Sequence, residues 1–413
     1  MKKVVVAIFV LLVIAAIAFV SLKPFFANKS FEKGNMLADS AQYDLAIDKF
    51  TRAIWFKSKI APYYFARGKA YAALNNDPVA IEDFSQAIGL NPGESDYYLF
   101  RGISQRKLRA LDQAMEDLNK AIELNDSSAK AFYHRGLLYA SLNQYDQAVK
   151  DYNRSIELDG SNIEAFYSRG ETRGNLEDFM GAIADYDKMI EGADAPIDAY
   201  KQRGIFKLKI QDFEGAESDL SRAAELETND KEIFYQLGQA KHNLNKVDES
   251  IELFNKALKL DAKYDLVYGA RGGAYLKKGN YKLSIADFTK AVELNPDYKR
   301  AYYGRGIAKA LSQDYAGSIK DFTKVIEIDK DFAQAYYNRA VSKAILGRHK
   351  EALPDYDIII QRDSRNAEAY YNRGISRMNV QDTKGACEDF KKAVDLKYQP
   401  AEPMLKMYCG SQG

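Results

Sequence analysis

The chain has 413 residues, and its 59 basic and 58 acidic side chains nearly balance. Because charges of both signs are interspersed and form no basic stripe, the composition argues against a nucleic-acid-binding protein. Two cysteines are too few for a disulfide-rich scaffold, and no Cys-x-x-Cys spacing indicates a zinc site.

Residues 1–26 differ in composition from the rest of the chain. After Lys2 and Lys3, residues 4–22 are uncharged and almost wholly apolar. A helix over this stretch rises roughly 28 Å, close to the thickness of the hydrocarbon core of a membrane. The segment therefore predicts an uncleaved signal anchor that crosses the membrane once. The alternative is a cleavable secretory signal with its small-residue cleavage site at residues 16–18.

The charge at the amino terminus predicts the orientation of this segment. Lys2 and Lys3 are expected on the cytoplasmic side, so the rest of the chain is expected on the extracytoplasmic (periplasmic) side of the membrane. Cleavage would instead leave a secreted protein. Trp55, the only tryptophan, lies near two lysines, a combination typical of a membrane interface. We expect Trp55 to contact the membrane, and packing against the entering chain is the alternative.

Residues 265–298 are a template for most of the chain. Two runs of apolar residues at helical spacing are joined by a turn signal at residues 278–280. Tyr268 and Gly272 lie on one face of the first run, and Phe288 lies on the apolar face of the second. We predict a two-helix hairpin, which cannot bury its apolar face without neighbours.

The same pattern recurs every 34 residues in both directions. With residue 265 as position 1, position 8 is glycine in ten repeats and alanine in one, position 20 is small, and position 24 is large. This predicts eleven consecutive repeats over residues 27–400, without insertions. Position 4 is aromatic in ten of them, namely Tyr64, Tyr98, Phe132, Phe166, Tyr200, Phe234, Tyr268, Tyr302, Tyr336 and Tyr370.

A 34-residue period with aromatic residues, glycine and alanine at these offsets resembles the tetratricopeptide repeat family. The resemblance implies an all-α fold, a right-handed superhelical solenoid of antiparallel helix pairs. The chain departs from the family in having arginine before the position-8 glycine and in keeping the closing proline only at Pro92 and Pro296. Residues 401–413 predict a capping helix and tail, so the predicted domains are 1–26, 27–400 and 401–413.

In this family the first helix of each repeat lines the concave side through positions that include 5 and 9. Here position 5 carries a ribbon of tyrosines, which bury area at low entropic cost. The resemblance thus implies a groove that docks an extended or helical segment of another protein. The alternative is that the rings pack on their neighbours. The predicted partner-binding tyrosines are Tyr133, Tyr167, Tyr235, Tyr303, Tyr337 and Tyr371.

Gly269 and Gly273 interrupt this ribbon at positions 5 and 9 of one repeat. Each glycine costs a helix about 1 kcal/mol relative to alanine. We expect both to leave bare backbone that a partner approaches closely, with neutral drift as the alternative. The family's clamp for a terminal carboxylate is not expected, because Ile205 stands at its asparagine position although Lys201 stands at its lysine position.

Nine repeats carry an arginine at position 7 and an aspartate at position 23. In repeat 231–264 both residues change together, to Leu237 and Leu253. This joint replacement predicts an ion pair between the two helices of one repeat rather than between successive repeats. We therefore expect Arg305→Leu to destabilise the protein more than Arg305→Leu combined with Asp321→Leu.

Cys387 lies in the last repeat and Cys409 at the end of the predicted capping helix. In an oxidising compartment these two residues are expected to form a disulfide. The alternative is a pair of buried free thiols.

The sequence contains no phosphate-binding loop and no nucleophile–base constellation. We therefore predict no catalytic residues, cofactor, metal site, small-molecule substrate or nucleic-acid partner. The predicted function is a membrane-anchored or exported scaffold that docks another protein. The alternative is a structural or assembly factor that acts through self-association.

Overall fold

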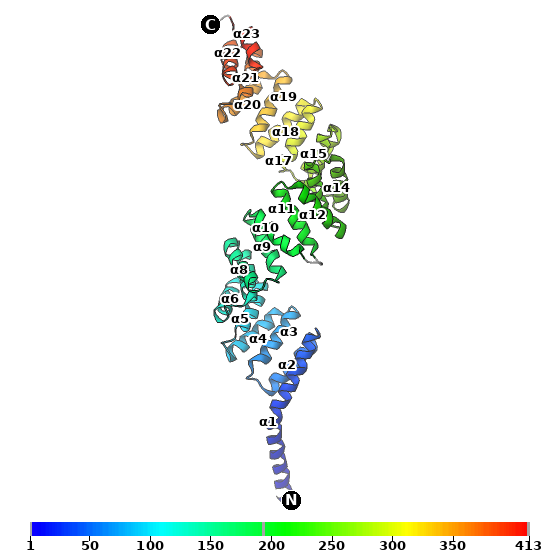
Figure 1. The fold of residues 1–413 in the computed structure, drawn as a ribbon, viewed down its shortest axis with the longest axis vertical. Helices are drawn as coiled ribbons and strands as arrows, with labels where there is room; N and C mark the ends of the chain where they lie inside the picture. The colour runs from blue at the N-terminus through cyan, green and yellow to red at the C-terminus, as the bar shows by residue number, and fades with distance from the viewer. Residues whose placement is uncertain (1, 192–194, 411–413) are drawn as a thin grey trace. The chain divides into compact units, whose positions relative to one another are not determined.

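The computed structural model describes residues 2–191 and 195–410, except for the side chains of residues 2–7 and 13–19. In these ranges the secondary structure is helical and contains no strand (Figure 1). The chain divides into two compact halves, residues 1–199 and 200–413, each described by itself below. This boundary falls inside the predicted solenoid of residues 27–400, whose bounds stay a prediction.

Each predicted repeat contains a pair of helices. The N-terminal half contains α1 (Lys2–Asp39), α2 (Tyr43–Phe56), α3 (Ala61–Ala73), α4 (Asp77–Leu90), α5 (Ser95–Lys107), α6 (Leu111–Leu124), α7 (Ala129–Ser141), α8 (Tyr145–Leu158), α9 (Ile163–Asn175) and α10 (Phe179–Ile190). Helix α11 (Ile197–Lys209) spans the boundary between the halves. The C-terminal half continues with α12 (Phe213–Leu226), α13 (Lys231–Asn243), α14 (Val247–Leu260), α15 (Asp265–Lys277), α16 (Tyr281–Leu294), α17 (Lys299–Leu311), α18 (Tyr315–Ile328), α19 (Ala333–Ile345), α20 (His349–Arg362), α21 (Ala367–Asn379), α22 (Thr383–Asp395) and α23 (Ala401–Cys409).

Helix α1 joins the apolar amino-terminal segment to the first repeat without a break. Among the residues whose side chains are described, no helix has a stretch that is both long and apolar enough to span a membrane. The predicted anchor, residues 4–22, lies in part outside the described residues, because side chains 4–7 and 13–19 are among those left undescribed. The anchor therefore stays a prediction.

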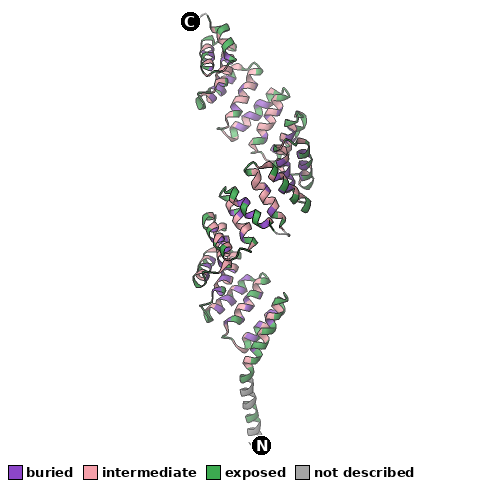
Figure 2. Ribbon diagram, viewed as in Figure 1, coloured by how far each residue is buried: buried purple, intermediate pink, exposed green. Residues whose placement is uncertain are grey.

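The two helices of a repeat meet closely at the position-8 glycine. A Cβ atom at Gly68 would stand 2.7 Å from the ring of Phe84, and one at Gly374 would stand 2.7 Å from the ring of Phe390. Both rings are fully buried. Glycine suits this position because a side chain here would displace the position-24 ring from the first helix. The exception is Ala340, which is fully buried in the repeat whose position-24 ring is Tyr356. Figure 2 shows the buried residues on the helix faces that meet within each half.

The turn between the two helices of a repeat contains a residue with positive φ. Gly279, in the predicted turn signal, has a φ of 76°. Most other repeats place asparagine, glutamine or another non-glycine residue at the same position, as at Asn143 with a φ of 57°. Asparagine tolerates this left-handed conformation better than most residues. The chain reversal therefore does not depend on glycine.

The predicted ion pair within each repeat is confirmed. Arg271 donates from Nε and Nη2 to the two carboxylate oxygens of Asp287, at 2.7 and 2.8 Å. The aspartates are buried, and a bidentate guanidinium satisfies both of their oxygens. The pairs are Arg67–Asp83, Arg101–Asp117, Arg135–Asp151, Arg169–Asp185, Arg203–Asp219, Arg271–Asp287, Arg305–Asp321, Arg339–Asp355 and Arg373–Asp389.

The same arginines also link successive repeats, which the sequence pattern did not reveal. In eight of them the third guanidinium nitrogen, Nη1, donates to position 25 of the preceding repeat, for example from Arg305 to Thr289 at 3.2 Å. The guanidinium also lies over the position-4 ring of its own repeat, at 5.3 Å from the centre of the Tyr302 ring. One side chain thus holds three neighbours in place.

In five repeats the aspartate has a second cation, at position 11. Lys309 lies 2.8 Å from Asp321, whereas Asp287 has only Arg271 as an ionic partner among the described residues. The five pairs with this extra cation are Arg173–Asp185, Lys207–Asp219, Lys309–Asp321, Lys343–Asp355 and Arg377–Asp389. The loss of stability expected for Arg305→Leu is therefore smaller than the sequence predicts, because Lys309 still compensates the charge of Asp321.

The carboxyl-terminal cap is also present. Helix α23 contacts α22, and Cys387 and Cys409 are disulfide-bonded, with their Cα atoms 5.7 Å apart. This confirms the predicted disulfide and excludes two free thiols. Ala401, at the start of α23, is fully buried, so the helix covers the last repeat as expected.

The second cation allows a matched stability test. We expect Arg271→Leu to lower the free energy of unfolding by about 3 kcal/mol, because it leaves the buried Asp287 without a cation. Arg305→Leu should cost less, since Lys309 remains beside Asp321. Adding Asp287→Leu to Arg271→Leu should recover most of the loss. Urea unfolding followed by circular dichroism measures all three variants, and an equal loss for the two single variants would contradict the charge-compensation account.

Candidate functional site

The side chains at positions 5 and 9 of the first helices of each half are here called the position-5 face. Its tyrosine rings pack on the position-24 rings of the same repeat, as the alternative interpretation expected, and Tyr303 lies 5.8 Å from Phe322. The rings are nevertheless only half-buried, so each keeps an accessible edge. These half-buried tyrosines are Tyr133, Tyr167, Tyr303, Tyr337 and Tyr371.

Tyr235 is different, because it is buried. Only 9% of its surface is exposed, and its ring lies between Tyr264, at 5.4 Å, and Phe254, at 6.4 Å. The expectation that Tyr235 presents an accessible anchor is therefore wrong. The physical reason is that Tyr235 belongs to a buried apolar cluster with Phe254 and Val267, against which Tyr264 also packs.

The predicted notch at Gly269 and Gly273 is half filled. A Cβ atom at Gly269 would stand 2.7 Å from the hydroxyl of Tyr298, which is position 34 of the same repeat. The ring of Tyr298 thus occupies the space that a position-5 side chain takes elsewhere. The expectation that Gly269 leaves bare backbone is therefore wrong. At Gly273, by contrast, no atom lies within 4 Å of a Cβ position, so that glycine does leave open space.

The structure brings Tyr303 and Tyr337 together at one hollow in the C-terminal half. The cavity has a volume of about 390 Å³, and Gln334, Asn338 and Glu368 also line it. The amide of Asn338 donates to the hydroxyl of Tyr303 at 3.0 Å. In the same way the amide of the residue at position 6 of the next repeat, Asn372, donates to the Tyr337 hydroxyl at 3.0 Å. This ladder holds the phenol rings in fixed orientations.

The hydroxyls in this cavity remain protonated at neutral pH. Burial raises the pKa of Tyr303, although the hydrogen bond from Asn338 opposes the shift. Burial, and then the hydrogen bond to Glu368, raises the pKa of Tyr337. The Tyr337 hydroxyl donates to the Glu368 carboxylate. The cavity wall therefore combines aromatic edges with amide and carboxylate groups that are able to pair with a peptide main chain.

Tyr371, Tyr133 and Tyr167 do not line this cavity. Tyr371 packs against Tyr398 at 5.3 Å. Tyr133 and Tyr167 belong to the N-terminal half, where Tyr167 donates to Glu171 at 3.2 Å.

A second hollow, which the sequence analysis missed, lies in the N-terminal half. Its volume is about 630 Å³, and it is lined by Phe31 and Phe65 at position 5 and by Asn35 and Lys69 at position 9. The ammonium group of Lys69 lies 5.1 Å from the centre of the Phe65 ring. The phenylalanines at position 5 are the sequence signal that indicates this hollow.

Lys201, which stands at the lysine position of the family's carboxylate clamp, is paired with acidic side chains of this chain. Its ammonium group lies 2.8 Å from both Asp230 and Glu232. These two carboxylates already neutralise it, so it has no free charge for a partner's carboxylate.

Family models match several parts of the chain. Models described as tetratricopeptide repeat match residues 129–162, 231–264, 367–400 and 65–129, and one described as TPR repeat matches residues 272–313. Together these ranges cover half of the chain. Three of them begin at the first residue of a predicted repeat, which confirms the phase of the repeats there. The number of eleven repeats stays a prediction.

Several solved structures are also similar to parts of this chain. YrrB, described as a TPR protein with an unusual peptide-binding site, is 27% identical over 45% of this chain and 96% of its own, with a TM-score of 0.41. Yeast Tom70 is 15% identical over 94% and 97%, with a TM-score of 0.41. A tetratricopeptide repeat protein from Parabacteroides merdae is 20% identical over 59% and 97%, with a TM-score of 0.44. No curated protein matches the sequence.

Substitution by alanine is expected to change the stability of the protein differently at Gly269 and at Gly273. Gly273→Ala should stabilise the protein by up to about 1 kcal/mol, because alanine favours the helix and meets no atom. Gly269→Ala should gain less or destabilise, because the new Cβ displaces Tyr298. The combination of Gly269→Ala with Tyr298→Ala should recover the helix-propensity gain. Thermal melts compare the variants, and equal stabilisation by both single changes would contradict the placement of Tyr298.

Proposed function

The chain belongs to the tetratricopeptide repeat family, and on this basis we propose that it is a scaffold that binds a segment of another protein on its position-5 face. This fold is typical of protein–protein interaction scaffolds, and the family is generally non-enzymatic. The observation that carries the proposal is the cavity of about 390 Å³ between Tyr303 and Tyr337. Half-buried phenol rings there stand beside amide and carboxylate groups.

An extended segment suits the chemistry of this cavity. Its apolar side chains would contact the ring edges, and its main-chain groups would pair with Gln334, Asn338 and Glu368. The rings are already held by the hydrogen-bond ladder, so little side-chain entropy is lost on binding. Gly273 leaves room for further contact in the same half.

The test fills the cavity without disturbing the core. Gln334 is an exposed residue at the cavity, and Gln334→Trp should reduce the partner recovered after in-cell cross-linking by about tenfold, equivalent to roughly 1.4 kcal/mol. The matched control is Gln361→Trp, an exposed position of the second helix in the same repeat. Equal recovery of the partner from both variants would contradict binding at this cavity.

Self-association is the second candidate function. In that case the only cross-linked partner would be another copy of the chain, and Gln334→Trp would not change its yield. Light scattering of the purified protein provides the same distinction without a partner.

We also propose that residues 4–22 anchor the chain in a membrane, with the repeats on the extracytoplasmic side. Apart from Ser21, the described side chains of this segment are exposed apolar groups, including Phe9, Leu11 and Val20. Trp55 is 68% exposed, and its ring also contacts Phe56 at 4.9 Å, which in turn stacks on Phe26 at 5.6 Å. An exposed tryptophan beside lysines favours a membrane interface over the interior of the protein.

Brominated lipids test this attachment. Because Trp55 is the only tryptophan, its fluorescence should be quenched when the full chain is reconstituted with them. The control combines Trp55→Gln with Gln361→Trp, which moves the tryptophan to the same repeat position in the C-terminal half. We expect much weaker quenching in that control. Equal quenching in both, or none in the wild type, would exclude contact by Trp55.

A further inference from the structure

Repeat 231–264 departs from the common pattern at three positions that border one cavity. Leu237 and Leu253 replace the arginine and aspartate of positions 7 and 23. Lys259 stands at position 29, where six other repeats have a glutamate that pairs with the basic residue at position 26. The changes therefore replace polar pairs with an apolar wall and an additional positive charge.

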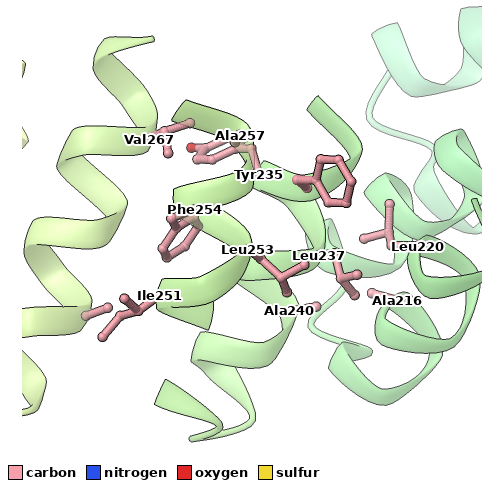
Figure 3. Packing of buried hydrophobic residues seen from close by; sticks show 12 residues of the cluster. Ala216, Leu220, Tyr235, Leu237, Ala240, Ile251, Leu253, Phe254, Ala257 and Val267 are labelled. Carbon is pink, nitrogen blue, oxygen red and sulfur yellow. The ribbon is translucent and has the colours of Figure 1, made fainter. Parts of the chain in front are cut away.

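The cavity has a volume of about 570 Å³, within the range of pockets that hold small ligands. Its wall is mainly apolar and comes from α12, α13 and α14. In eight other repeats an arginine crosses from position 7 to position 25 of the preceding repeat, as Arg271 does to Asn255. Leu237 cannot make that contact with Ser221, which lines the cavity. Figure 3 shows Leu237 and Leu253 close together, with Leu220 and Ala216 of the preceding repeat nearby.

The rim of the cavity is positively charged. Lys256 and Lys259 are both exposed and line it, and neither takes part in an ion pair within the described part of the chain. The ammonium group of Lys256 lies 5.6 Å from the centre of the Phe234 ring. Glu225, on the opposite rim, is already paired with Arg222 at 3.0 Å. The two lysines are therefore uncompensated charges beside an apolar wall.

We propose that this cavity binds an amphiphilic anion, a hydrocarbon chain with a carboxylate head of the fatty-acid class. The hydrocarbon would pack on Phe234, Leu237 and Leu253, and the carboxylate would pair with Lys256 and Lys259. A peptide main chain suits the wall less, because only the hydroxyls of Ser221 and Thr228 offer neutral polar partners. A hydrocarbon chain has no polar groups that need hydrogen-bond partners.

This site is separate from the position-5 face. Leu237 follows Tyr235 by two residues, which is roughly 200° around a helix. Binding here is therefore independent of the proposed partner docking, and either can fail without the other.

Decanoate, below its micelle concentration, is the probe for isothermal titration calorimetry on the full chain. We expect saturable binding at one site, with decanol binding at least about tenfold more weakly, since it lacks the charge. Leu237→Arg with Leu253→Asp restores the pair present in nine other repeats and should abolish decanoate binding. A thermal melt of this double variant verifies that the fold is retained.

Lys259→Glu restores the pairing of positions 26 and 29 and should remove the preference for decanoate over decanol. Its matched control is Lys282→Glu, an equal charge change at an exposed position on α16, which should keep that preference. Absence of saturation in the wild type, or unchanged affinity in the folded Leu237→Arg, Leu253→Asp variant, would overturn the proposal. An acidic, leucine-containing peptide that binds this cavity more tightly than decanoate would also overturn it, in favour of a protein ligand.

Discussion

The bidentate ion pair between positions 7 and 23 is the polar interaction that nine of the helix pairs of this chain share. Most of these arginines place two nitrogens on a buried aspartate, a third on the preceding repeat, and their plane on an aromatic ring, as Arg305 does with Asp321, Thr289 and Tyr302. Buried charges are costly unless their hydrogen-bonding capacity is filled. Here one side chain fills it and also sets the register between repeats.

The consequence of losing this pair is visible in repeat 231–264. Leu237 and Leu253 join the largest apolar cluster described in the C-terminal half, so the two helices still pack together. The leucines cannot replace the hydrogen bond that a guanidinium donates to the preceding repeat. The gap between repeats then stays open as an apolar cavity, and two lysines without carboxylate partners border it. A substitution that is neutral for the helix pair thus creates a surface that other repeats do not have.

The position-5 face follows a different rule. Its half-buried rings pack on the position-24 rings, as Tyr303 does against Phe322, and the hydroxyls of Tyr303 and Tyr337 accept hydrogen bonds from asparagine amides. Residues at position 34 alter this face locally: Tyr264 packs on the buried Tyr235, Tyr298 fills the space over Gly269, and Phe332 packs on Tyr303, which stays half-buried. The accessible parts of the face are therefore hollows bounded by these local differences rather than one uniform ribbon.

Much of the fold was determined by the sequence alone, because it rests on local periodicity and on side chains that change together. Glycine at position 8, opposite a ring at position 24, predicts a close helix pair, and the joint change to Leu237 and Leu253 predicts the ion pair within one repeat. The disulfide between Cys387 and Cys409 followed from the expected capping helix. These features repeat at fixed offsets, so a linear pattern contains them.

Only the tertiary structure decided which surfaces remain open. Three features depend on how far a side chain reaches across packed helices. They are the position of Tyr298 over Gly269, the second cation Lys309 beside Asp321, and the hydrogen bond from Arg305 to Thr289. The spacing of residues along the chain does not specify that reach. Cavities in particular are what neighbouring side chains leave unfilled, so they are properties of the packing and not of any single residue.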